Sequence, residues 1–131
     1  MKELVIGIKN ELTSIVKESD TAISVGSGDL PVYATPAMIA LMEKACATSI
    51  HGYLPDDSTT VGVSINIKHL AATPLNMKVK VTCELIRIDK RKLVFNIIAF
   101  DEKEKIGEGL HERFIIKKES FLEKIIQKKQ Q

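Results

Sequence analysis

The sequence carries no strong excess of charge of either sign. Nineteen lysines and arginines stand against 17 aspartates and glutamates, which gives a formal net charge of +2. So weak a field favours neither nucleic acid nor an anionic membrane as a partner. The basic residues of the C-terminal stretch KKESFLEKIIQKKQQ are interrupted by glutamates. We therefore predict a solvated, partly frayed end there and not a binding patch.

Long apolar runs are also missing. No segment has the length and apolar character that spanning a bilayer requires. The N-terminal stretch MKELVIGIKNELTS contains neither a continuous apolar core nor a small-residue cleavage site, so it does not have the pattern of a secretory signal. We expect a cytoplasmic protein with no membrane partner.

Cysteine is scarce. Cys46 and Cys83 are far apart, and neither belongs to a metal-binding or redox motif. Both stand among apolar residues, which predicts two buried core positions. Buried thiols suit a reducing compartment. We expect no metal site.

The length and composition are ordinary for a globular protein. The 131 residues are 44% hydrophobic and 27% charged, and a chain of this size can bury one core without staples. Neither repeats nor a linker divide it. We predict one domain over residues 1–131, with residues 119–131 as a tail or short helix.

Alternating apolar residues predict strands on both sides of a single helix. Residues 3–17 read as one or two strands with a break near Asn10, and a glycine-rich loop follows at residues 24–31. Later strands are predicted around residues 59–70, 77–89, 92–101 and 104–118. In the first of these, Val61, Val63, Ile65, Ile67 and His69 are predicted to share one face. Residues 92–101 are apolar on both faces, which suggests that a second subunit also covers the sheet.

The stretch ATPAMIALMEKAC begins the predicted helix. Thr35 before Pro36 has the pattern of an N-cap followed by proline at the first helical position. Gly52 supplies a stop after about His51. Glu43 lies about 100° around the helix from Lys44 and so falls off the polar side.

One apolar helix needs a sheet that wraps it. The pattern therefore predicts an α+β protein with a hotdog fold, in which a curved antiparallel sheet surrounds one long central helix.

Three polar residues occupy places that are otherwise apolar: Thr35 at the helix start, Glu43 two turns later, and His69 on a strand. Each alone has a structural explanation, as a cap, a solvated carboxylate and a core histidine. His51 and His111 are interpreted as structural or exposed. Together, a carboxylate that burial would penalise, an imidazole, a hydroxyl and a helix N-terminus make an acyl-transfer site plausible.

The motifs ATPAMIALMEKAC, IKHLAATP and GEGLHERFII resemble the fluoroacetyl-CoA thioesterase-like branch of the hotdog superfamily, from about Tyr33 to Phe121. The resemblance implies a catalytic triad of Thr35, Glu43 and His69 at a subunit interface. It implies for Arg113 either contact with the CoA moiety or an internal pair. The segment SVGSGDLPVY matches less well and is expected to border the acyl pocket, which leaves the acyl group open.

We therefore predict a homodimeric acyl-CoA thioesterase that converts a small acyl-CoA to a carboxylate and CoA. It needs no cofactor, because CoA is part of the substrate. Glu43 acts as general base or as nucleophile. Two other classes stay open: an acyl-CoA-binding module without turnover, and a hotdog hydratase or dehydratase. A purely structural dimer is a further alternative. The sequence does not decide between CoA and acyl carrier protein, or whether dimers pair into a tetramer.

Overall fold

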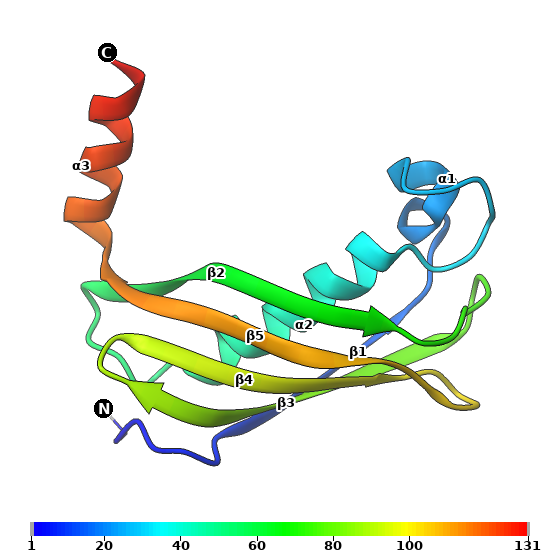
Figure 1. The fold of residues 1–131 in the computed structure, drawn as a ribbon, viewed down its shortest axis with the longest axis horizontal. Coiled ribbons are helices and arrows are strands. Elements are labelled where there is room, and N and C mark those ends of the chain that lie inside the picture. Colours follow the sequence, from blue (N-terminus) through cyan, green and yellow to red (C-terminus); the bar gives the residue numbers. More distant parts are fainter. Residues whose placement is uncertain (1, 131) are drawn as a thin grey trace.

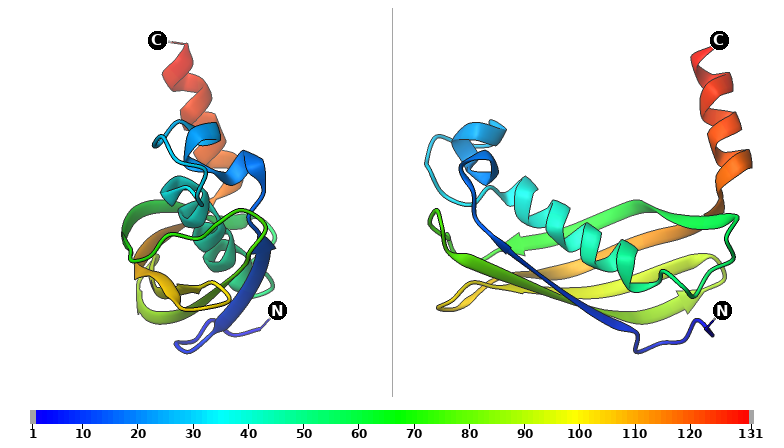
Figure 2. Two further views of the ribbon diagram at one scale, coloured as in Figure 1. Left: turned by 90° about the vertical axis from the view of Figure 1, so that its right-hand side faces the viewer. Right: turned by 180° about the vertical axis from the view of Figure 1, so that it is seen from behind.

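In the computed structural model, which describes residues 2–130, five antiparallel strands curve around one long helix (Figure 1 and Figure 2). The strand order is β1-β3-β4-β5-β2, so β1 and β2 are the two edges. This arrangement confirms the predicted α+β hotdog fold. The strands are β1 Lys9–Ile15, β2 Ser58–His69, β3 Lys78–Asp89, β4 Lys92–Phe100 and β5 Lys105–Lys117.

The long helix, α2 Thr35–Ser49, lies across the concave face of the sheet (Figure 2). Its buried side includes Met38, Met42 and Cys46, which pack against inward residues of β3 and β4 such as Leu85 and Phe95. Each such apolar side chain stabilises the fold by about 1.5–3 kcal/mol. Cys83 is also buried, and neither cysteine forms a disulfide, so the two predicted core positions are confirmed.

The predicted cap of α2 is wrong by one residue. Ala34 is the N-cap and makes no side-chain hydrogen bond, while Thr35 and Pro36 are the first two helical residues. Ala34 already has extended backbone angles, so the chain turns into the helix before Thr35. The Thr35 hydroxyl is consequently not used as a cap. The helix ends close to the predicted stop, with Gly52 in a left-handed conformation at φ +90°.

The predicted break near Asn10 lies about three residues earlier, because residues 3–8 form no strand and β1 begins at Lys9. The Asn10 side-chain amide donates to the Ala45 carbonyl and to the Thr48 hydroxyl, each at 3.0 Å. Since α2 satisfies this inward polar group, the strand has no reason to stop there. The chain turns earlier, at Gly7, where φ is +103°. Between β1 and α2 lie two short turns of helix, η1 Glu18–Asp20 and α1 Ala22–Val25.

A β-bulge in β2 changes which residues face α2. The register with β5 shifts between Gly62 and Ser64, so that Gly62 lies opposite Arg113 and His69 opposite Gly107. His69 therefore shares a face with Ile65 and Ile67, as predicted. Val61 does not, because the extra residue in the bulge reverses the alternation before it.

The face of the sheet turned away from α2 is open in this chain. Residues of β4 that point inward are fully buried, whereas Asn96 on the opposite face is exposed and Ile98 is half-buried. The prediction that β4 is apolar on both faces is therefore wrong at Asn96. A second subunit on this face stays a prediction.

The C-terminal segment forms a helix, α3 Lys118–Lys129, which projects beyond the edge formed by β2 (Figure 1). Leu122, Ile125 and Ile126 are exposed on it. Within residues 2–130, none of the helices combines the length and the apolar character needed to cross a membrane.

Candidate active site

Two of the three predicted catalytic residues are in contact. The Thr35 hydroxyl lies 2.7 Å from Nδ1 of His69. Thr35 opens α2, and His69 ends β2. Gly107 permits this approach, because a Cβ there would come within 2.8 Å of Met38, one turn along α2 from Thr35. Because Gly107 has no side chain, the first turns of α2 can pack closely against the strands beside His69.

The surroundings of His69 favour a neutral imidazole. Partial burial lowers the pKa of His69, and the nearby backbone of Ala71 opposes this effect. The other ring nitrogen, Nε2, is buried and has no hydrogen-bond partner among the described residues. Since buried polar atoms are normally satisfied, Nε2 is available to a water, a substrate or another side chain. A neutral imidazole beside a hydroxyl can accept or return a proton near neutral pH.

Glu43 is separated from that pair. It follows Thr35 by eight residues on α2, which at 1.5 Å per residue is about 12 Å along the helix axis. Its carboxylate instead lies 3.9 Å from Nε2 of His111 and 3.9 Å from the guanidinium of Arg113. The side chain of Glu43 is 43% exposed, so the expectation of a buried carboxylate is wrong for the single chain.

Arg113 is buried, and each of its three guanidinium nitrogens has a partner inside the chain. Its Nε donates to the Thr60 hydroxyl at 2.8 Å, and one terminal nitrogen donates to the Thr60 carbonyl at 3.1 Å. The other terminal nitrogen lies 3.0 Å from Nε2 of His111. Burial lowers the pKa of Arg113, and Glu43 opposes this effect. Of the two roles that the sequence allowed, the single chain has the internal pair. Contact with CoA was the other role that the resemblance allowed.

His111 was interpreted as structural or exposed, and the structure buries it at the centre of this cluster with 1% of its surface exposed. Nδ1 lies 2.8 Å from the Ser64 carbonyl. Burial is the largest cause that lowers the pKa of His111, and the Arg113 cation adds to it. The sequence offered one weak signal, the spacing of two residues between His111 and Arg113, which places both on the same face of a strand.

Known proteins resemble this chain in sequence and in fold. A family model described as fluoroacetyl-CoA-specific thioesterase matches residues 16–119. A fluoroacetyl-CoA thioesterase of Streptantibioticus cattleyicolor is 40% identical over 97 residues, which cover 74% of this chain and 70% of that protein. This chain is a member of the fluoroacetyl-CoA-specific thioesterase family. Membership confirms the resemblance and the expected class of thioester hydrolase.

Solved structures agree with this assignment. The fluoroacetyl-CoA thioesterase FlK superposes with a TM-score of 0.91 at 32% identity, covering 97% of this chain and 98% of the other. A Thermus thermophilus member of the thioesterase superfamily also gives a TM-score of 0.91, over 99% of this chain and 96% of its own. That protein is 23% identical, so it supports the fold alone.

The thioesterase family match begins at residue 16, earlier than the resemblance from about Tyr33. The intervening segment contributes to the site, because Ala22, Ser27 and Val32 line one pocket together with Thr35 and His69. Tyr33 lines it as well. Burial, assisted by Asp20, raises the pKa of Tyr33 to about 12, which keeps its hydroxyl protonated. The glycine-rich loop thus borders the Thr35–His69 pair, and its role as a wall of the acyl pocket stays a prediction.

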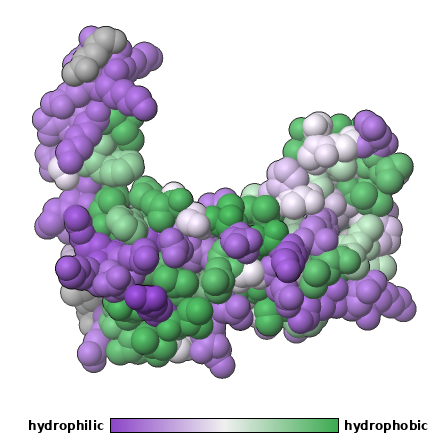
Figure 3. Space-filling view, in the orientation of Figure 1, coloured by the Kyte–Doolittle hydropathy of each residue, from purple (hydrophilic) through white to green (hydrophobic). Residues whose placement is uncertain are grey.

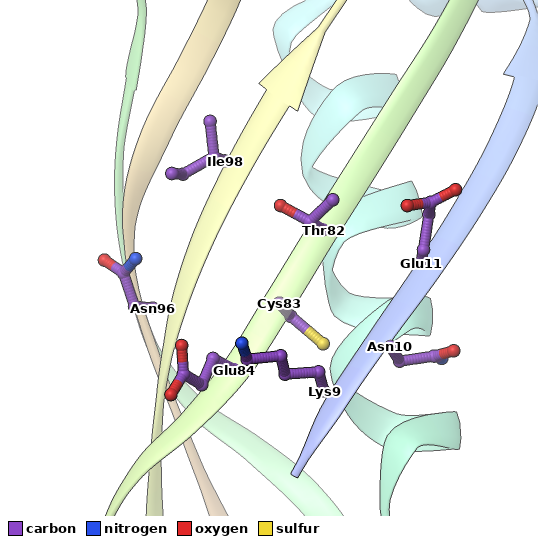
Figure 4. A pocket seen from close by; sticks show the side chains of 8 residues that line it. All are labelled: Lys9, Asn10, Glu11, Thr82, Cys83, Glu84, Asn96 and Ile98. Carbon is purple, nitrogen blue, oxygen red and sulfur yellow. The ribbon is translucent and has the colours of Figure 1, made fainter. Parts of the chain in front are cut away.

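A larger open groove of this thioesterase lies elsewhere, on the face of the sheet turned away from α2 (Figure 4). Lys9, Glu11, Glu84 and Asn96 line it from β1, β3 and β4. None of the predicted catalytic residues contributes to it. Its polar side chains have the character of a solvated sheet face.

Proposed function

We propose that this thioesterase hydrolyses a small acyl-CoA at a site that Thr35, Glu43 and His69 form between two copies of the chain. The observation that carries the proposal is the 2.7 Å contact of Thr35 with His69, together with the unpartnered Nε2 of the same ring. The family supplies the reaction class, and its characterised member is named for fluoroacetyl-CoA. We keep the cytoplasmic location as a prediction.

A two-fold axis would bring Glu43 of one copy to the Thr35–His69 pair of the other. If two α2 helices run antiparallel, Glu43 of each faces Thr35 of the other when they cross midway, at residue 39. The neighbouring Ala40 is exposed and small, which permits close approach of two helices.

The β2 edge supports the same axis. Gly62 lies beside the Glu43 carboxylate, since a Cβ at Gly62 would be 3.0 Å from it. Antiparallel pairing of two β2 strands centred on Asn66, with the bulge residue Val63 left unpaired, sets Gly62 of one opposite His69 of the other. The crossing point of the two α2 helices and the pairing centre of the two β2 strands are thus compatible with a single two-fold axis.

The edge itself has the properties of an interface. β2 has no neighbour on one side within the described chain, and such an edge is a template for another strand. Val63, in the bulge, is 52% exposed, and Ile65 is also exposed. Figure 3 shows a hollow above this edge, between α3 and the α1 end, with apolar side chains on its floor. A second copy of the chain that packed there, forming a homodimer, would cover these side chains.

Hydrolysis in such a site follows ordinary acyl-transfer chemistry. A water, deprotonated by Glu43, attacks the thioester carbonyl carbon while the Thr35 hydroxyl and amides of the first turn of α2 hold the developing oxyanion. The C–S bond then breaks, and the sulfur leaves with a proton delivered through His69. In the other route, the Glu43 carboxylate attacks the carbonyl carbon, and the C–S bond breaks as CoA leaves with a proton delivered through His69. A water then hydrolyses the resulting mixed anhydride and frees Glu43. Neither route needs a cofactor beyond the CoA of the substrate.

Release of free thiol from a panel of acyl-CoAs, including acetyl-CoA and fluoroacetyl-CoA, tests this proposal. Wild type is compared with Glu43→Ala and His69→Ala, and Glu123→Ala on α3 serves as a control for loss of an exposed carboxylate. Loss of a general base typically costs about 10²- to 10⁴-fold in rate. Turnover that collapses in both site variants and survives in the control supports the proposal. CoA thioesters that bind without turnover favour an acyl-CoA-binding module instead.

A further inference from the structure

The Glu43 carboxylate has an ordered set of buried polar groups behind it. Thr60 on β2 accepts two hydrogen bonds from Arg113 on β5, through its hydroxyl and its carbonyl. Arg113 in turn contacts His111, and His111 contacts the carbonyl of Ser64. These contacts fix a cation and an imidazole on the inner face of the sheet, directly opposite Glu43.

The proton positions of this set follow from its partners. A carbonyl oxygen only accepts, so Nδ1 of His111 carries the hydrogen that it donates to Ser64. Guanidinium nitrogens only donate, so Nε2 of His111 accepts from Arg113. His111 is therefore neutral in this arrangement and holds the guanidinium without competing with it for Glu43.

The distances to Glu43 suit attraction without direct bonding. Both Arg113 and His111 lie 3.9 Å from the carboxylate oxygen, which is longer than a hydrogen bond. The cation thus attracts the carboxylate and leaves its lone pairs free for a water or a thioester carbon. Such freedom is what a general base or a nucleophile needs.

Gly62 keeps the space between these groups open. A Cβ at this position would lie 3.0 Å from the Glu43 carboxylate oxygen, 3.1 Å from the His111 ring and 3.3 Å from the Arg113 guanidinium. A side chain at residue 62 would therefore push the carboxylate away from its cation. Gly62 was not singled out from the sequence, where it stood only as one member of a strand.

We propose that His111 and Arg113, with Gly62 as the spacer, are positioning residues that hold the Glu43 carboxylate for catalysis, and that Arg113 does not bind CoA. The inference rests on the proposed function, because it assigns these residues to the orientation of a base that the reaction uses. It predicts that their loss slows chemistry and leaves CoA affinity unchanged.

The test uses two substrates with one acyl group, an acyl-CoA and the matching N-acetylcysteamine thioester, which has no nucleotide or phosphates. Arg113→Gln and Gly62→Ala are expected to lower kcat by about 10²-fold on both substrates, because misplacement by about 1 Å costs that much. Arg113→Lys keeps the charge and should restore part of the rate. The exposed Arg87→Gln is the matched control and should leave kcat unchanged.

Calorimetric titration with CoA separates the possible failures. We expect the Kd of CoA for Arg113→Gln and Gly62→Ala to stay within about twofold of the wild-type value. Loss of a direct contact worth about 1.4 kcal/mol would raise the Kd about tenfold. A Kd raised tenfold or more, with the cysteamine thioester turned over normally, would overturn the inference and make Arg113 a CoA ligand. Full activity of Gly62→Ala, which removes no charge, would overturn it as well. A wild type that neither binds CoA nor hydrolyses either substrate would refute the proposed function, and the inference with it.

Discussion

The Thr35 hydroxyl and Nδ1 of His69 lie 2.7 Å apart, within hydrogen-bond distance. This contact joins the first turn of α2 to the last residue of β2. Because Nδ1 of His69 meets Thr35, the unpartnered Nε2 is the nitrogen left for the reaction. The pair therefore orients the ring as well as supplying a hydroxyl.

Thr35→Ala is expected to lower kcat by about 10²- to 10³-fold, the usual effect of removing one oxyanion donor. Thr35→Ser keeps the hydroxyl and should retain most of the activity. The measurement is thiol release at saturating substrate. Equal losses in Thr35→Ala and Thr35→Ser would mean that the methyl group, and not the hydroxyl, matters at this position.

Mixing of inactive subunits tests whether the site spans two copies. A heterodimer of Glu43→Ala with His69→Ala regains one intact site if Glu43 acts on the other copy, and none if it acts on its own. Random exchange of symmetric dimers should then restore about a quarter of wild-type activity. The variants are denatured, mixed, refolded and assayed. A mixture as inactive as either variant alone would locate all three residues on one chain.

The part of the fold predictable from sequence was the part set by apolar periodicity and by strong stop signals. One long apolar helix between alternating strands required a wrapping sheet, and Gly52 marked the helix end. The bulge at Val63 was not predictable, because nothing in an alternating run marks an extra residue. The contact of the Asn10 amide with α2 was not predictable for a related reason: its acceptor, the Ala45 carbonyl, is 35 residues away.

The sequence predicted only part of the arrangement of the candidate site. Thr35 and His69 meet as expected, because one ends a strand beside the start of the helix that carries the other. Glu43 was expected among them and lies with His111 and Arg113 instead. That partnership depends on the bulge, since the register it sets puts Gly62 opposite Arg113. Long-range pairing of this kind has no local signature in one sequence.

Gly107→Ala should destabilise the fold next to the site. Its Cβ would lie 2.8 Å from the Met38 sulfur and methyl, and Met38 is fully buried, so the end of the Met38 side chain would have to shift within the core. Overpacking of this kind typically costs about 1–3 kcal/mol. Denaturant unfolding gives the free energy of unfolding, and Glu108→Ala in the next strand position is the control, expected within about 1 kcal/mol of wild type. Equal stability of both variants would show that α2 and β5 are less closely packed here.

Acid should lower the free energy of unfolding of this protein over a pH range set by two of its histidines. Burial lowers the pKa of His111 below its ordinary value of 6.5, and the same holds for His69. Below pH 6.5 the unfolded chain binds protons at these rings while the folded chain does not. By linkage, the stability is fully present above that pH and is lost as the pH falls toward the folded-state pKa values.

Urea unfolding at a series of pH values from 8 to 5 measures this loss, with the fall beginning near 6.5. The His111→Gln variant has a lower free energy of unfolding at every pH, since Gln cannot reproduce both ring contacts, but its slope with pH should be shallower than that of wild type. Replacement of the exposed His51 by Gln is the control for the loss of an imidazole outside this cluster. An undiminished slope in His111→Gln would mean that this ring is not held neutral, and that the Arg113 guanidinium faces Glu43 without the imidazole as its acceptor.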